Sequence, residues 1–186
     1  MKNFSKLFIV FTVLCLAVWF TLSGTEAGIL TLQIGVKQNS TFLTRVFIAL
    51  GANPKDTGQE GMSALHVASY LGSDQVIPLL IEKGAPINLP DEQGRTALHL
   101  AAYNGQASAV AALMDHKANP EIKDSANEMT ALHYAVIQKH SDVVKILLEK
   151  GANADAEEKN TYTPLFIAEQ EGLNDIATIL KEHNAH

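Results

Sequence analysis

Residues 94–102 read Gly-Arg-Thr-Ala-Leu-His-Leu-Ala-Ala, and variants of this stretch recur along the chain. The central leucine returns at intervals of 33, 34 and 33 residues, at Leu65, Leu98, Leu132 and Leu165. A nearly fixed period of this size is typical of stacked repeats, in which each unit buries its apolar face against its neighbours. The sequence therefore predicts one elongated array rather than an ordinary globule.

Each repeat contains the signals of two short helices. A hydroxyl residue lies two positions before the leucine and suits the N-cap of the first helix, at Ser63, Thr96, Thr130 and Thr163. Glycine, which tolerates a left-handed backbone, follows this helix in three units, and Lys139 takes that place in the other. The second helix is rich in leucine, isoleucine and valine, and the polar segment after it predicts a projecting turn.

This order of residues resembles the ankyrin repeat, to which residues 94–102 and Gly151-Ala152-Asn153 are close matches. The resemblance implies an all-α repeat solenoid of helix-turn-helix units with projecting β-turn or hairpin loops. We expect a degenerate N-terminal capping repeat, in which only the second helix is well marked, then three ankyrin repeats and a C-terminal capping repeat. Their expected bounds are 28–60, 61–93, 94–127, 128–160 and 161–186.

Residues 1–27 have the order of a secretory signal peptide. Lys2 and Lys6 precede an apolar run from Leu7 to Leu22, which small and polar residues follow. The run of 16 residues is shorter than the roughly 20 that a membrane-spanning helix needs. An uncleaved signal anchor is the alternative. Both versions export the repeats, to the periplasm or the exterior, so we expect a periplasmic, secreted or externally anchored protein.

The charge balance and the cysteine count narrow the classes of partner and chemistry. The formal net charge is −6, which argues against nucleic acid or an anionic membrane surface as the partner. We therefore expect a neutral or basic protein partner, no nucleic acid, and no membrane contact beyond an N-terminal anchor. The one cysteine, Cys15, lies inside the predicted signal segment, so a processed chain has no thiol. We also expect a monomer.

Three histidines, His66, His99 and His133, occupy matching positions and raise the question of a metal site. Each belongs to a different layer, and stacked helices stand roughly 8–10 Å apart, whereas zinc binds nitrogen at about 2.0–2.1 Å. One ion therefore cannot hold all three, and we expect no metal and no cofactor. The resemblance implies that these histidines bond neighbouring backbone and order the turns, and that Thr96, Thr130 and Thr163 are structural.

In ankyrin repeats the projecting turns and the first helices line a concave surface that grips proteins, and the resemblance carries this role to the matching variable positions. Tyrosine and arginine are common anchors of protein interfaces. Packing between layers is the alternative for any one of these side chains. The expected partner-binding residues are Tyr70, Arg95, Tyr103, Asn104, Gln138 and Tyr162.

No catalytic constellation is visible in the sequence. It contains no phosphate loop, nucleophile elbow or paired carboxylates, and Asp155, Glu157 and Glu158 predict a solvated turn. We therefore expect an exported, non-enzymatic module that captures a protein on its concave face and inhibits or protects it. A membrane-anchored structural spacer is the alternative, and an enzyme that uses the acidic turns is a third hypothesis.

Overall fold

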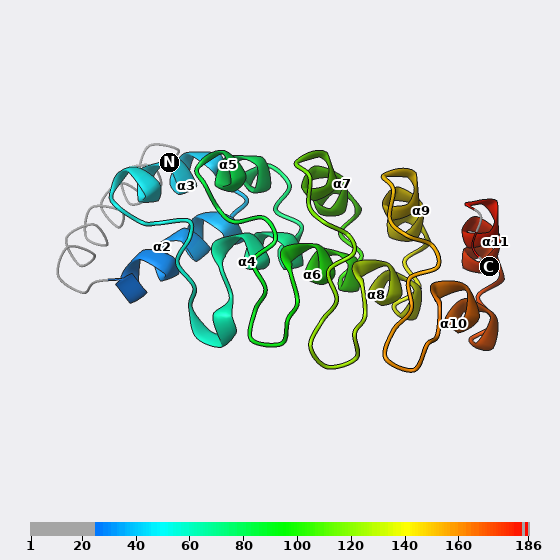
Figure 1. The fold of residues 1–186 in the computed structure, drawn as a ribbon. Helices are drawn as coiled ribbons and strands as arrows, with labels where there is room; N and C mark the ends of the chain where they lie inside the picture. Colours follow the sequence, from blue (N-terminus) through cyan, green and yellow to red (C-terminus); the bar gives the residue numbers. More distant parts are fainter. Residues whose placement is uncertain (1–24, 184, 186) are drawn as a thin grey trace.

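The computed structural model describes residues 25–183 and residue 185, and in this part of the chain the helices form five pairs side by side (Figure 1). The first helices of the pairs lie in one row and the second helices in another. This arrangement confirms the predicted all-α ankyrin-type solenoid. The first helices are α2 (Thr25–Lys37), α4 (Ala64–Leu71), α6 (Ala97–Tyr103), α8 (Ala131–Ile137) and α10 (Pro164–Gln170). The second helices are α3 (Thr41–Ala49), α5 (Val76–Glu82), α7 (Ala107–Asp115), α9 (Ser141–Glu149) and α11 (Asn174–Glu182).

The repeating leucines and alanines form the continuous core of the array. Leu65, Leu98 and Leu132 are almost fully buried, and Leu165 is buried as well. A small residue one turn further along each first helix lets neighbouring layers approach closely, because it adds little beyond its Cβ atom. These residues are Ala68, Ala101, Ala135 and Ala168, all without exposed surface. Burial between layers, rather than within one unit, therefore stabilises the fold.

Four turns project beyond the first helices and are linked to one another in series (Figure 1). Backbone N–H groups of Glu92, Ser125 and Lys159 each donate to a carbonyl of the preceding turn, over 2.9–3.1 Å. The strand-like pairing among the described residues is an isolated antiparallel bridge between Thr57 and Ser63. The turns are therefore a hydrogen-bonded row, and each one depends on its neighbour for its conformation.

The first unit differs from the degenerate repeat that the sequence predicts. Its first helix, α2, is complete and 13 residues long, with Leu32 and Val36 fully buried. Residues 25–29 are helical here, whereas their equivalents in the second unit, residues 58–62, belong to the projecting turn. Residues 1–24 of the predicted signal segment lie outside the described residues. Among the described residues, no helix is long and apolar enough to cross a membrane.

Left-handed residues end the helices, as the glycine pattern predicts. Gly51, Gly84 and Gly151 follow three of the second helices at positive φ, and Lys117 takes the same place after α7 with φ 69°. A side chain in this backbone region costs roughly 1–2 kcal/mol, which glycine avoids. Lys117 is exposed, so no packing contact offsets this cost.

We therefore expect Lys117→Gly to raise the free energy of unfolding by about 1 kcal/mol, after the greater entropy of glycine in the unfolded chain is allowed for. Urea denaturation of the two proteins measures the change. Gly151→Ala is the matched control, because φ is 92° at Gly151 and an added Cβ meets no atom within 4 Å. It should lower stability, and a destabilised Lys117→Gly protein would contradict the argument.

Candidate functional site

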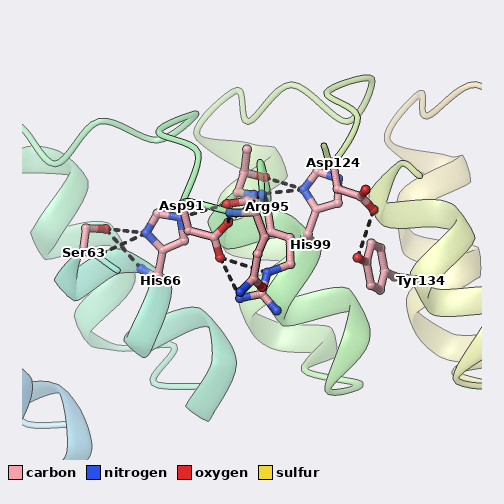
Figure 2. A network of polar contacts seen from close by, with 9 residues as sticks. Ser63, His66, Asp91, Arg95, His99, Asp124 and Tyr134 are labelled. Atoms are coloured by element: carbon pink, nitrogen blue, oxygen red, sulfur yellow. Dashed lines mark hydrogen bonds and ion pairs between the residues drawn. The ribbon is translucent and has the colours of Figure 1, made fainter. Parts of the chain in front are cut away.

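Three histidines, His66, His99 and His133, join successive repeats through their two ring nitrogens, and Figure 2 shows the first two. In each, Nδ1 accepts a hydrogen bond from the backbone N–H of the hydroxyl residue three positions earlier, so Nε2 carries the proton. Nε2 then donates to a carbonyl of the next projecting turn. The N–H donors are Ser63, Thr96 and Thr130, at 3.1, 3.1 and 3.2 Å from Nδ1. The carbonyls belong to Arg95, Met129 and Tyr162, at 3.2, 3.1 and 3.2 Å from Nε2.

Burial keeps these three histidines neutral. His66, His99 and His133 are almost fully buried, and this loss of hydration lowers the pKa of each ring below the usual 6.5. The carbonyl at Nε2 opposes the shift but is the smaller influence. Among the described residues, no group of three or more histidine, cysteine or acidic side chains is placed to hold a metal ion.

The hydroxyl residues form the other half of these contacts. The hydroxyl oxygens of Thr96 and Thr130 lie 2.9 Å from Nδ1 of His99 and His133 respectively. Thr163 caps α10 differently, because its hydroxyl accepts the backbone N–H of Phe166 at 3.2 Å. The three threonines therefore all lie at first-helix N-termini and bond within them.

Each of the last three turns is organised around a buried carboxylate. Asp91, Asp124 and Glu158 each accept two backbone N–H bonds from their own turn, through one oxygen, over 2.7–3.3 Å. The prediction of a fully solvated acidic turn is therefore wrong at Glu158, which is 5% exposed. Glu157 is exposed and Asp155 is half-buried. Glu158 stabilises its turn because the N–H groups compensate for its burial.

Arg95 and Tyr134 extend this polar network, as Figure 2 shows. The Arg95 guanidinium lies against Asp91 Oδ2, with Nε at 2.8 Å and Nη2 at 2.7 Å, and 26% of its side chain is exposed. The Tyr134 hydroxyl donates to Asp124 Oδ2 at 2.9 Å. Burial, followed by this hydrogen bond, raises the pKa of Tyr134 to about 12. Arg95 therefore has an intramolecular partner, although the sequence predicts it as a partner contact.

The predicted partner-binding residues divide into exposed and bonded groups. Tyr70, Tyr103 and Tyr162 are each 42–45% exposed, and Gln138 is exposed. Asn104, in contrast, is half-buried, and its Nδ2 donates to the Tyr70 carbonyl at 2.7 Å. The Asn104 side chain therefore links neighbouring repeats, whereas the Arg95 side chain bonds within its own turn.

Two further exposed apolar side chains lie on first helices, close to Tyr162 and next to Tyr70. Phe166 stacks on Tyr162 with ring centroids 4.6 Å apart, and Leu71 follows Tyr70 at the end of α4. Phe166 was not among the predicted partner residues. Its sequence signal is that phenylalanine replaces the repeated histidine in the last unit. We define the aromatic row as Tyr70, Leu71, Tyr103, Tyr162 and Phe166, each 41–45% exposed.

The projecting turns give the adjoining surface an acidic character. Residues 53–62, 86–95, 119–129 and 153–162 together carry ten acidic and four basic side chains, a net charge of −6. The three buried carboxylates contribute to this charge, although they accept hydrogen bonds within their own turns. The first-helix side of the array therefore combines exposed aromatic groups with negatively charged turns.

The family follows from the fold, this hydrogen-bond pattern and a sequence match. The family description "Ankyrin repeats (3 copies)" matches residues 32–124 and 117–186. Two overlapping matches thus cover most of the chain, and the chain belongs to the ankyrin repeat family. An ankyrin array is a protein-binding module, so this is the class of function that the chain has.

Several much larger proteins contain similar repeats. Human "Ankyrin repeat and SOCS box protein 3" is 42% identical over 113 residues, which are 61% of this chain and 22% of that protein. The "Putative palmitoyltransferase ZDHHC13" of Danio rerio is 30% identical over 149 residues, 79% of this chain and 23% of that protein. "Potassium channel AKT1" of Arabidopsis thaliana is 39% identical over 57 residues, 31% of this chain and 7% of that protein. The chain thus spans less than a quarter of these relatives' lengths, and the likeness concerns the repeats alone.

Proposed function

We propose that this chain is an exported, non-enzymatic module that binds a basic or neutral protein on its aromatic row. One observation carries the proposal: four exposed apolar side chains lie on first helices and Tyr162 lies in the turn before α10, beside turns with a net charge of −6. Tyrosine and phenylalanine supply apolar contact area, and the acidic turns favour a positively charged partner. Binding then inhibits or protects that partner.

The export part of the proposal is supported by the order of residues 1–27, with lysines before an apolar run. The rival function is a structural spacer held by a retained anchor. N-terminal sequencing of the protein isolated from its native cells separates the two. A start near Gly28 favours the exported module, and an intact Met1 favours the anchored spacer.

We expect a photo-crosslinking side chain in place of Leu71 to capture one stoichiometric partner, whereas the same group in place of Lys145 should not. Leu71 belongs to the aromatic row, whereas Lys145 is an exposed residue of α9, which lies among the second helices of the array. Mass spectrometry of the crosslinked product identifies the partner. Equal crosslinking from both positions would contradict binding on the aromatic row.

With that partner in hand, Tyr103→Ala should weaken binding by about 2 kcal/mol, roughly a thirtyfold rise in Kd, if Tyr103 anchors the interface. The reason is the loss of a large exposed ring that contacts Tyr134 with its centroid 6.0 Å away. Titration calorimetry measures the change, and Lys145→Ala is the matched surface control. If neither Tyr103→Ala nor Tyr70→Ala changed the Kd, the aromatic row would be excluded as the binding surface.

A further inference from the structure

Exposed apolar side chains occur at a second place, outside the aromatic row. The eight large exposed hydrophobic residues among the described part of the chain include the five of the aromatic row. The other three, Leu30, Phe42 and Leu50, all belong to the first unit. Phe42 is 69% exposed, the most of the eight. The proposed protein-binding function does not account for them.

Comparison with the other second helices shows that these side chains are not required by the fold. Phe42 lies in the first turn of α3 and Leu50 is its C-cap residue, and every later unit has a polar or charged residue at these two positions. At the register of Phe42 these residues are Gln75, Ser108, Asp142 and Asp175. At the register of Leu50 they are Lys83, His116, Lys150 and His183. The repeat therefore tolerates polar residues here, and the first unit is the exception.

The apolar residues on the outer side of α3 form one stripe. Phe42, Val46, Ala49 and Leu50 follow the spacing of a single helix side, and we call them the cap stripe. Leu43 and Phe47 lie on the core-facing side of α3, since both are buried. Val46 is half-buried, and the other three side chains of the stripe are exposed. The helix thus has an apolar outer side as well as an apolar inner side.

The charge around the cap stripe is opposite to that of the turns. Residues 27–54 contain no acidic residue, whereas Lys37, Arg45 and the following Lys55 are basic and exposed. None of these three cations forms an ion pair with another described residue. The overall charge of −6 argues against an anionic surface for the chain as a whole, but between residues 25 and 55 the one acidic residue, Glu26, is outnumbered by three basic residues. The first unit is locally cationic.

We propose that the cap stripe docks on an anionic phospholipid surface. Aromatic and leucine side chains enter the boundary between headgroups and acyl chains, and neighbouring cations bind anionic headgroups. Where the N-terminal segment is retained as an anchor, its apolar run of residues 7–22 directly precedes α2 in the sequence, and the first unit is the repeat next to the bilayer. A second copy of the chain fits less well, because Lys37 and Arg45 would face their own counterparts. The proposal does not depend on the aromatic row.

The test uses the full chain with Cys15→Ser and one fluorophore that brightens in an apolar environment. The fluorophore is attached at Ala49→Cys in the cap stripe or, as the matched control, at Ser108→Cys, an exposed position of α7. Emission is recorded without vesicles, with phosphatidylcholine vesicles, and with mixed phosphatidylcholine and phosphatidylglycerol vesicles. We expect emission at position 49 to rise about twofold or more only with the mixed vesicles, and emission at position 108 to stay unchanged.

Variants then assign the response to named side chains. Phe42→Ser with Leu50→Ser should abolish the rise, as should Lys37→Glu with Arg45→Glu, while far-UV circular dichroism stays unchanged. Tyr70→Ser with Tyr103→Ser should keep the full rise, which separates this proposal from the proposed function. Four results would overturn it: equal emission with both kinds of vesicle, a rise at both label positions, a bright signal without vesicles, or a rise that depends on protein concentration. The last two indicate coverage by another segment of the chain or by a second copy.

Discussion

His99→Ala is expected to lower the free energy of unfolding by about 3 kcal/mol, because it leaves the buried Thr96 N–H without a partner, removes one of the two hydrogen bonds of the Met129 carbonyl and opens a cavity. The ring accepts the Thr96 N–H at 3.1 Å and donates to the Met129 carbonyl at 3.1 Å, and it is 1% exposed. An unpaired buried donor or acceptor costs about 1–3 kcal/mol, and the lost ring adds a cavity. Urea denaturation followed by circular dichroism measures the loss.

His116→Ala provides the matched control for this substitution. His116 is exposed, and its ring bonds only the Ala112 carbonyl of its own helix, at 2.8 Å. We expect this variant to lie within about 0.5 kcal/mol of the natural protein, as surface substitutions usually do. If the two variants had the same stability, the histidines would not be the links between repeats that the geometry indicates.

The position of His99 in the middle of the array adds a second expectation for the same variant. The ring joins α6 to the turn before α8, so its removal weakens the contact between two halves of the solenoid. Repeat arrays unfold as units coupled only to their neighbours, and a weakened interface lowers their cooperativity. The urea transition of His99→Ala should therefore be broader than that of the natural protein, with a smaller m-value.

The fold could be predicted because the same physical requirements recur in every unit. Leu98 and Ala101 must be buried in each layer, so the same residue types return at a fixed interval and reveal the period. Helix ends were equally readable, since Thr96 and Gly105 stand where an N-cap and a left-handed residue are needed. A single globular core has no such repetition, and its contacts are much harder to infer from one sequence.

The α2 helix was harder to predict because its glycine has a packing role. Glycine inside a helix costs about 1 kcal/mol relative to alanine and usually lowers the expectation of a helix. At Gly35, however, an added Cβ would lie 2.8 Å from Thr44 Oγ1 of α3. The close approach of α2 and α3 therefore requires the missing side chain. Only the position of the partner helix shows this.

The roles of Arg95 and Glu158 could not be predicted from their types alone. An exposed arginine beside a turn resembles an interface anchor, and consecutive acidic residues resemble a solvated loop. Both interpretations ignore how the turn folds back on itself, which places a carboxylate against its own N–H groups. A signal was present, however, since Asp91, Asp124 and Glu158 all lie seven or eight residues before the repeating leucine. That shared register is a structural signal rather than a local charge pattern.

The other large effect that we expect is a loss of stability in mild acid. The pKa values of His66, His99 and His133 are lowered in the folded protein, mainly by burial. Below pH 6.5, the ordinary pKa of histidine, the unfolded chain therefore binds more protons than the folded chain. The three neutral histidines therefore make their full contribution to the free energy of unfolding above about pH 6.5. This contribution falls as the pH drops, until the folded rings are protonated as well.

Protonation also places a hydrogen on Nδ1, where each ring now accepts a backbone N–H, so the cation loses that contact. Nearby carboxylates moderate the effect, since Asp91 raises the pKa of His66 and Asp124 raises that of His99.

Each histidine adds at most about 1.4 kcal/mol per pH unit to the slope of stability against pH. Urea midpoints between about pH 8 and pH 5 measure that slope. His99→Ala should reduce the slope by about a third, because one of the three buried histidines is removed. An equal slope in both proteins would mean that other groups cause the acid sensitivity.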